Sequence, residues 1–195
     1  MPESAPLPVR LGEADRAAIT DHFLALDAED RRLRFGASIA DESIRRLDER
    51  IDFGRDAIFA IAGEDVRLVA VAHVAHYPAR AELGLSVLAG FRGRGLGNAL
   101  FERAAMHLTN RGVREVFVHC LGENGAMLRL ARRNRMRIVF GEGEADAHLV
   151  LPPATPVSVL SESFRELVAR ACHQSRRNSR LAIDALKAIT PRPAN

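Results

Sequence analysis

The stretch ELGLSVLAGFRGRGLG, residues 82–97, decides the fold. In its first half the apolar residues Leu83, Leu85 and Val87 alternate with small ones, which is the period of a β-strand. Its second half has glycine at every second position from 93 to 97. Apolar residues then recur at helical spacing until Gly112, a residue suited to end a helix. The stretch is therefore predicted to be a strand, a glycine turn and the start of a helix.

A glycine turn at the start of a helix favours an anion. Glycine lets the backbone approach a ligand closely, and the first N–H groups of a helix have no partner within the helix. The positive end of the helix dipole points the same way. The pattern is typical of a phosphate site, although an ordinary strand-to-helix turn made tight by glycine is the alternative.

The spacing of the glycines excludes the two common nucleotide loops. The dinucleotide fingerprint G-x-G-x-x-G requires a glycine where the chain has Asn98. It also requires an acid at the end of the next strand, whereas Glu115 lies at the beginning of that strand. The nucleotide P-loop requires Gly-Lys-Ser/Thr, which the chain lacks. What remains is Arg-x-x-Gly-x-Gly, starting at Arg92, between a strand and a helix.

This motif resembles the coenzyme A loop of the GNAT superfamily of N-acetyltransferases, whose pattern is Gln/Arg-x-x-Gly-x-Gly/Ala. The context of the match, a strand before the loop and a helix after it, agrees with that family. The resemblance implies coenzyme contacts from these residues: Val87, Leu88, Arg92, Gly93, Arg94, Gly95, Leu96, Gly97, Asn98 and Asn124. For Asn124 the alternative is a cap on the helix that follows it, and the two roles are compatible.

The order of the expected elements also resembles the GNAT fold. We expect a strand at 9–11, helices at 13–27 and 41–51, and three strands at 58–62, 68–77 and from 82. A helix from 96, a strand at 113–121, a helix after 124 and a strand pair at 137–140 and 147–151 follow. The fold class is thus α/β (α+β), with a mixed central sheet of about seven strands flanked by helices. The resemblance implies that the strands carrying Val87 and Val118 splay apart around the pantetheine arm.

The segment between the first two expected helices has an unusual composition. The basic and apolar segment 30–36 is expected between the first two helices. It contains Leu33-Arg34-Phe35, which resembles a segment in GNAT domains of bacterial protein-lysine acetyltransferases. We expect the GNAT acetyltransferase domain to span residues 1–151.

Residues 152–195 are then a Pro-rich linker and a C-terminal helical extension. A capping box at Ser163–Glu166 predicts a helix start there, followed by an apolar stripe from Phe164 to Ala171. We expect this extension to pack on its own domain. The alternatives are a homodimer contact through the helices and a cover over the substrate cleft.

For catalysis the resemblance implies Glu82 as the base that deprotonates an amine. The alternative is a solvated carboxylate at the strand end, paired with Arg80. The family commonly places an acid, tyrosine, seven residues after Asn124, where this chain has Ala131. Arg135 and Met136 replace the Gly-Phe that follows in the family. Either water protonates the leaving thiolate, or the chain only binds an acyl-CoA.

Composition narrows the remaining classes of function. The 195 residues are 47% hydrophobic and 27% charged, with a formal net charge of +3, which is ordinary for a globular domain. No apolar run reaches the roughly 20 residues that span a membrane. Cys120 and Cys172 have no metal or redox spacing, so we expect no metal and a cytoplasmic location. The arginine run at 129–137 reads first as a solvated face, and its lack of aromatic residues does not favour nucleic acid.

The sequence therefore predicts an acetyl-CoA-dependent N-acetyltransferase. Its acceptor would be a primary amine, either a small molecule or a protein lysine or N-terminus, acetylated by direct transfer. The alternatives are a non-catalytic acyl-CoA-binding regulatory module and, less favoured, a basic nucleic-acid-binding protein.

Overall fold

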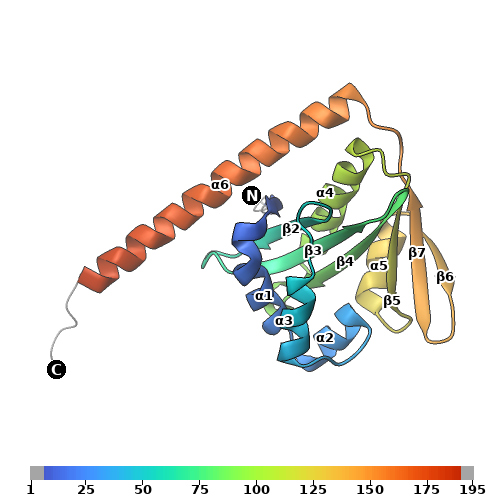
Figure 1. Cartoon of the computed structure of the whole chain (residues 1–195), viewed down its shortest axis with the longest axis horizontal. Helices are drawn as coiled ribbons and strands as arrows, with labels where there is room; N and C mark the ends of the chain where they lie inside the picture. Colours follow the sequence, from blue (N-terminus) through green and yellow to red (C-terminus); the bar gives the residue numbers. More distant parts are fainter. Residues whose placement is uncertain (1–6, 190–195) are drawn as a thin grey trace.

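Seven strands form one mixed sheet in the order β1-β2-β3-β4-β5-β7-β6 (Figure 1). The computed structural model describes the backbone of residues 7–189 and the side chains of residues 7–180 and 182. Residues 1–6 of the expected GNAT domain and residues 190–195 of the expected C-terminal extension lie outside the described residues. The strands are β1 (Val9–Leu11), β2 (Ala57–Ala62), β3 (Leu68–His76), β4 (Arg80–Val87), β5 (Glu115–Leu121), β6 (Arg137–Phe140) and β7 (Glu144–Val150).

Helices cover both faces of this sheet. One face is packed by α1 (Arg16–Leu24) and α3 (Asp41–Glu49), with α2 (Ala28–Phe35) beside β4 and β5. The other face is packed by α4 (Leu96–Asn110) and α5 (Gly125–Arg133). Two single 3-10 turns, η1 (Glu13–Asp15) and η2 (Ala89–Phe91), precede α1 and the glycine turn. The last helix, α6 (Pro156–Ile189), runs past β1 and α4. This arrangement confirms the expected fold class.

The central strands are apolar on both sides because both faces of the sheet are covered. All six residues of β2, AIFAIA, are buried. Phe59 and Ile61 face the α4 side, and Ile58 and Ala60 face the α1 side. Burying large aliphatic and aromatic side chains contributes roughly 1.5–3 kcal/mol each. The core therefore consists of two clusters separated by the sheet.

The strands β4 and β5 are parallel neighbours that pair over three residues only. Arg80, Ala81 and Glu82 pair with residues 115–117. Beyond that point residues 83–87 of β4 pair with β3 alone, and residues 118–121 of β5 pair with β7 alone. The expected splaying of the strands that carry Val87 and Val118 is confirmed, and the gap opens directly after Glu82.

The expectation of two helices before β2 is wrong, because the described residues contain a third. Segment 30–36, expected to connect two helices, belongs mostly to α2. The Asp27 side chain accepts a hydrogen bond from the backbone N–H of Asp30 and so caps its start. Gly36 ends it in the left-handed conformation, φ +78°. Both cap residues were visible in the sequence, but the charged residues between them lack a clear apolar stripe.

The predicted helix start at Ser163 is also wrong. Ser163 lies inside α6, where its hydroxyl donates to the carbonyl of Val159. The cap is Thr155, whose hydroxyl accepts from the N–H of Ser158 at 3.1 Å, while the Ser158 hydroxyl accepts from the N–H of Thr155 at 3.0 Å. This reciprocal pair is followed by a proline at the first helical position, which proline favours.

The helix α6 packs on its own domain, as expected, through ion pairs as well as through the buried Ala169. Arg103 of α4 is 5% exposed and binds Glu162 at 2.8 Å and Glu166 at 2.7 Å. The predicted stripe faces outward instead: Phe164 and Leu167 are 68% and 67% exposed. The homodimer through this helix stays a prediction, as does the domain boundary at residue 151.

Replacing Arg135 by glycine should stabilise the fold. Arg135 follows α5 and has φ +56°, a left-handed conformation that costs an L-residue roughly 1–2 kcal/mol and glycine nothing. The higher unfolded-state entropy of glycine offsets part of this gain. We expect Arg135→Gly to raise the free energy of unfolding in urea by up to about 1 kcal/mol. Arg135→Ala, which keeps the Cβ atom, should leave it nearly unchanged; a loss of stability on Arg135→Gly would contradict this account.

Replacing Glu162 by glutamine should destabilise the fold in a pH-dependent way. Burial raises the pKa of Glu162, but hydrogen bonds from His107, Asn110 and Arg103 outweigh it and lower the pKa to about 2. A depressed pKa stabilises the folded state above the unfolded value of about 4.5, and the gain is lost as the pH falls towards 2. We expect Glu162→Gln to cost on the order of 3 kcal/mol at pH 7 and much less near pH 2.

Urea unfolding at several pH values measures this difference. Glu42→Gln is the matched control, because Glu42 is 68% exposed and, among the described residues, pairs with its helix neighbour Arg46 at 3.3 Å. A difference between wild type and Glu162→Gln that stays constant from pH 7 to pH 2 would exclude the proposed ion-pair origin.

Candidate active site

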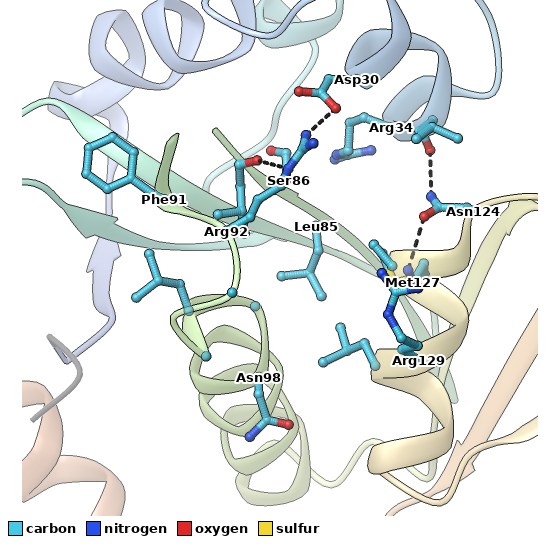
Figure 2. Close-up of a pocket in the computed structure, with 18 of the residues that line it drawn as sticks. Asp30, Arg34, Leu85, Ser86, Phe91, Arg92, Asn98, Asn124, Met127 and Arg129 are labelled. Atoms are coloured by element: carbon cyan, nitrogen blue, oxygen red, sulfur yellow. Dashed lines mark hydrogen bonds and ion pairs between the residues drawn. The ribbon is translucent and has the colours of Figure 1, made fainter. Parts of the chain in front are cut away.

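A cavity of about 480 Å³ lies at the point where the glycine turn, α2 and α5 meet beside β4 (Figure 2). Its walls come from segments far apart in the chain. The lining residues are Leu26, Asp30, Leu33, Arg34, Leu85, Ser86, Val87, Phe91, Arg92, Gly93, Gly95, Leu96, Gly97, Asn98, Asn124, Ala126, Met127, Arg129, Leu130 and Arg133. The cavity therefore begins at the turn and extends along β4 beside its open edge.

The turn presents unpaired backbone donors to this cavity. None of the N–H groups of residues 93–98 donates a hydrogen bond to another described residue; the first N–H of α4 that does so belongs to Ala99. Gly93 and Gly95 have φ of +75° and +78°, which only glycine adopts without strain. Gly95 is the N-cap of the 15-residue helix α4, so the helix dipole adds to the positive potential. The turn has the geometry of an anion site.

Arg92 points away from the turn and towards α2 (Figure 2). Its Nε donates to the carbonyl of Val87 at 3.2 Å, and its Nη2 forms an ion pair with Asp30. Asp30 is 8% exposed and lines the cavity. The sequence had not indicated this carboxylate, which lies 62 residues from Arg92. In this arrangement Asp30 competes with an anion in the cavity for Arg92.

Ser86 offers the cavity a hydrogen-bond acceptor. Its hydroxyl lies 2.8 Å from Nε2 of the buried His22, whose Nδ1 lies 2.9 Å from the carbonyl of Leu68. Burial lowers the pKa of His22 to about 4, so its ring is neutral at pH 7. Because Nδ1 faces a carbonyl, it carries the proton, and Nε2 accepts from the Ser86 hydroxyl. The lone pairs of Ser86 remain for a donor in the cavity.

Arg34 enters the cavity from α2 without a carboxylate partner. Its guanidinium lies 5.0 Å from the ring centroid of Phe35 and 5.6 Å from that of Phe23. Its buried Nε has no hydrogen bond, and no ion pair joins it to the described residues. Burial lowers the pKa of Arg34 to about 10, and the charge of Glu82 opposes this. The group stays cationic at neutral pH.

Asn124 connects the two helices on either side of the cavity. Its Oδ1 accepts from the N–H of Met127 at 3.1 Å, which caps α5, and its Nδ2 donates to the carbonyl of Leu33 at 3.2 Å (Figure 2). Both sets of bonds are made within the protein. Asn124 therefore holds α2 against α5 and fixes the width of the cavity.

Glu82 lies outside this cavity, at the last paired position of β4 and β5. It shares one face of the sheet with Gly84 and Ser86, since side chains alternate along a strand. The Tyr77 hydroxyl lies 3.5 Å from a Glu82 carboxylate oxygen. The alternative pairing with Arg80 is absent, because the Arg80 guanidinium stacks over the Phe117 ring at 5.2 Å.

The cavity gathers most of the expected coenzyme contacts but not all. Leu88 is 8% exposed and packs in the core cluster on the α1 side. Arg94 donates to the carbonyl of Gly90 at 3.0 Å and stacks over Phe91, outside the cavity. Conversely, Arg129 and Arg133 line the cavity, although the arginine run was interpreted first as a solvated face. Their i, i+4 spacing on one helix was the signal that could have placed them together.

Two positions explain how α5 departs from the family pattern. Ala131, at the expected tyrosine position, is 1% exposed and packs in the core. Met136, which follows α5 at the position where the family has phenylalanine, is 7% exposed. Among the described residues, no group of His, Cys, Asp and Glu side chains is placed to hold a metal ion. Nor does any described helix combine the length and hydropathy needed to cross a membrane.

Comparisons with known proteins agree with this architecture. The GNAT domain of S. lividans PAT superposes with a TM-score of 0.61 at 21% identity, covering 74% of this chain and 88% of that one. The ribosomal-protein-S18-alanine N-acetyltransferase from Escherichia coli gives 0.57 at 17% identity, covering 77% and 97%. A ribosomal L7/L12 α-N-protein acetyltransferase solved with coenzyme A gives 0.54 at 16% identity, also covering 77% and 97%.

These identities establish likeness of fold alone, and a search of curated proteins finds no match. The family model described as "Acetyltransferase (GNAT) family" matches residues 23–135, which is more than half of the chain and includes the glycine turn and α5. The chain belongs to the GNAT acetyltransferase family.

Proposed function

We propose that this protein transfers an acetyl group from acetyl-CoA to a primary amine by direct attack of the amine on the thioester. The observation that carries the proposal is the row of unpaired N–H groups at residues 93–98. These donors lie at one end of a cavity that extends along β4 beside the gap between β4 and β5. A thioester carrier matches both parts of this cavity: its anionic head suits the N–H groups of the turn, and its amide-rich arm suits the gap beside β4.

The phosphates of coenzyme A would bind at the turn. The N–H groups of residues 93–98 would bind the diphosphate oxygens, with the dipole of α4 behind them. Arg129 and Arg133 face the same cavity from α5 and supply additional positive charge. The pantetheine arm would lie in the gap beside β4, where the Ser86 hydroxyl accepts from a donor. Leu88 and Arg94 lie outside the cavity, so their proposed roles are limited to shaping the turn.

Glu82 is proposed as the base. A lysine-like amine has a pKa near 10.4 and is mostly protonated at pH 7, so it must lose a proton before it attacks. Glu82 lies where the gap ends, on the face of the sheet that also carries a partly exposed row of aromatic rings. In this row the ring centroids of Tyr77 and Phe117 are 6.3 Å apart, and those of Phe117 and His148 are 6.2 Å apart. The row offers the acceptor's alkyl stem an apolar platform.

One observation favours the second candidate, a non-catalytic module that binds an acyl-CoA. Ala131 supplies no acid to the leaving thiolate and faces the core. The loss of one general acid lowers a rate by roughly 10²–10⁴-fold, which still leaves most of the rate due to proximity. Catalysis is therefore the preferred proposal. The cytoplasmic location stays a prediction.

A screen of amines and peptides that follows the release of free CoA tests the proposed function. In this assay, we expect Glu82→Gln to lower the turnover at pH 7 by about 100-fold or more, with the dissociation constant of CoA unchanged. Glu64→Gln, which changes an exposed glutamate in the hairpin between β2 and β3, is the control. Stabilisation by acetyl-CoA without CoA release on any amine would support the binding module, and unchanged turnover would remove Glu82 as the base.

Replacing Asp30 by asparagine should tighten the binding of CoA. The change removes a carboxylate from the cavity and releases Arg92 from its ion pair, while the backbone N–H that caps α2 remains. We expect calorimetry to show a dissociation constant for CoA that is about fivefold lower. This corresponds to about 1 kcal/mol, the upper end of what one charge pair near the surface contributes. Asp41→Asn is the control, since Asp41 pairs with Arg31 outside the cavity. Weaker binding of CoA would instead mean that Asp30 orients Arg92 for the phosphate.

A further inference from the structure

Arg34 is a cation of the cavity that forms no ion pair with any described carboxylate, although the charge of Glu82 acts on it. Two neighbouring arginines are paired: Arg92 with Asp30, and Arg32 with Glu29 and Glu123. Taking a guanidinium out of water without a counter-ion is unfavourable, as its lowered pKa reflects. Such a group is well placed to receive negative charge from a ligand in the cavity.

The position of the guanidinium is set by Gly84. A Cβ atom built on Gly84 would lie 2.5 Å from Arg34 Cζ, so the guanidinium rests directly on the backbone of β4. Gly84 is two residues from Glu82 and three from Val87, or about 10 Å along the strand from the end near the turn. It therefore lies at the inner end of the gap between β4 and β5, where the reacting thioester would be.

The titratable groups whose charges interact with Arg34 are His22, His73 and Glu82. Burial lowers the pKa values of both His22 and His73, and the charge of Arg34 lowers them further. Asp56 faces His73 at 3.1 Å. The negative charge of Glu82 acts on Arg34. Glu82 lies on β4 two residues before Gly84, so both point to the same face of the sheet.

We propose that Arg34 stabilises the negative charge of the leaving coenzyme A thiolate, in place of the acid that Ala131 cannot supply. The inference rests on the proposed function. The ammonium first loses one proton to Glu82, which passes it to solvent. The neutral amine nitrogen then bonds to the thioester carbon, and the second proton that it sheds passes to Glu82. The C–S bond then breaks, and its electron pair leaves with the sulfur as a thiolate beside Arg34. The proton held by Glu82 returns through solvent to the thiolate, which gives the amide and free CoA.

Titration of the thiol of bound CoA tests this inference. CoA is bound to the full chain, and the ultraviolet absorbance of its thiolate is followed against pH, after subtraction of the same titration without CoA. We expect the pKa of the CoA thiol to be at least about one unit lower in the wild type than in Arg34→Met, because a nearby positive charge stabilises the thiolate. In the transfer assay Arg34→Met should lower kcat about 100-fold, with little change in the KM of the amine.

Three further variants separate this role from a structural one. Gly84→Ala keeps every charge but displaces the guanidinium, so it should raise the thiol pKa as Arg34→Met does. Arg34→Lys keeps a positive charge and should fall between the wild type and Arg34→Met. Arg32→Met is the control, because it removes an arginine of the same helix that pairs outside the cavity, and it should leave the thiol pKa unchanged.

The outcomes distinguish the inference from the proposed function. Equal thiol pKa values in the wild type and Arg34→Met, with CoA bound to both, would overturn the role of Arg34 and leave the proposed function standing. The same result with a raised KM only for amines that carry a carboxylate would assign Arg34 to the acceptor instead. Failure of the wild type to bind CoA would overturn both.

Discussion

The separation of β4 from β5 is the constraint on which the rest of the site depends. Paired for three residues, the strands diverge after Glu82 and Phe117, so one edge of β4 faces a gap instead of a neighbouring strand. Backbone donors and acceptors away from water require partners, and this edge has none in the sheet. A ligand rich in amides supplies them. The same divergence places the glycine turn, Gly84 and Glu82 along one line.

The helix α2 turns this gap into a cavity with a defined charge. Its carbonyl at Leu33 is tied to Asn124, which also caps α5, so one side chain sets the distance between two walls. From the same helix Asp30 holds Arg92, and Arg34 lies on the backbone at Gly84. The local potential therefore depends on a helix with no obvious apolar stripe, whose position is fixed by polar contacts.

The helix α6 is held in part in a similar way, by ion pairs beside the buried Ala169. Arg103 lies over the Phe59 ring at 4.5 Å and pairs with two glutamates of α6. Removing one member of such an enclosed network leaves a charge without a partner. Several apolar side chains in the described part of α6 remain exposed, including Val157, Leu160 and Phe164.

The sequence by itself determined the strand, the glycine turn and the helix that follows, because backbone preferences depend on residues a few positions apart. It also determined the buried strands, since a continuous apolar run such as that of β2 suits a sheet covered on both faces. Only the tertiary structure decided which charges meet. Asp30 lies 62 residues from Arg92, and Glu162 lies 59 from Arg103. Such pairs depend on strand order and helix docking, which no local spacing encodes.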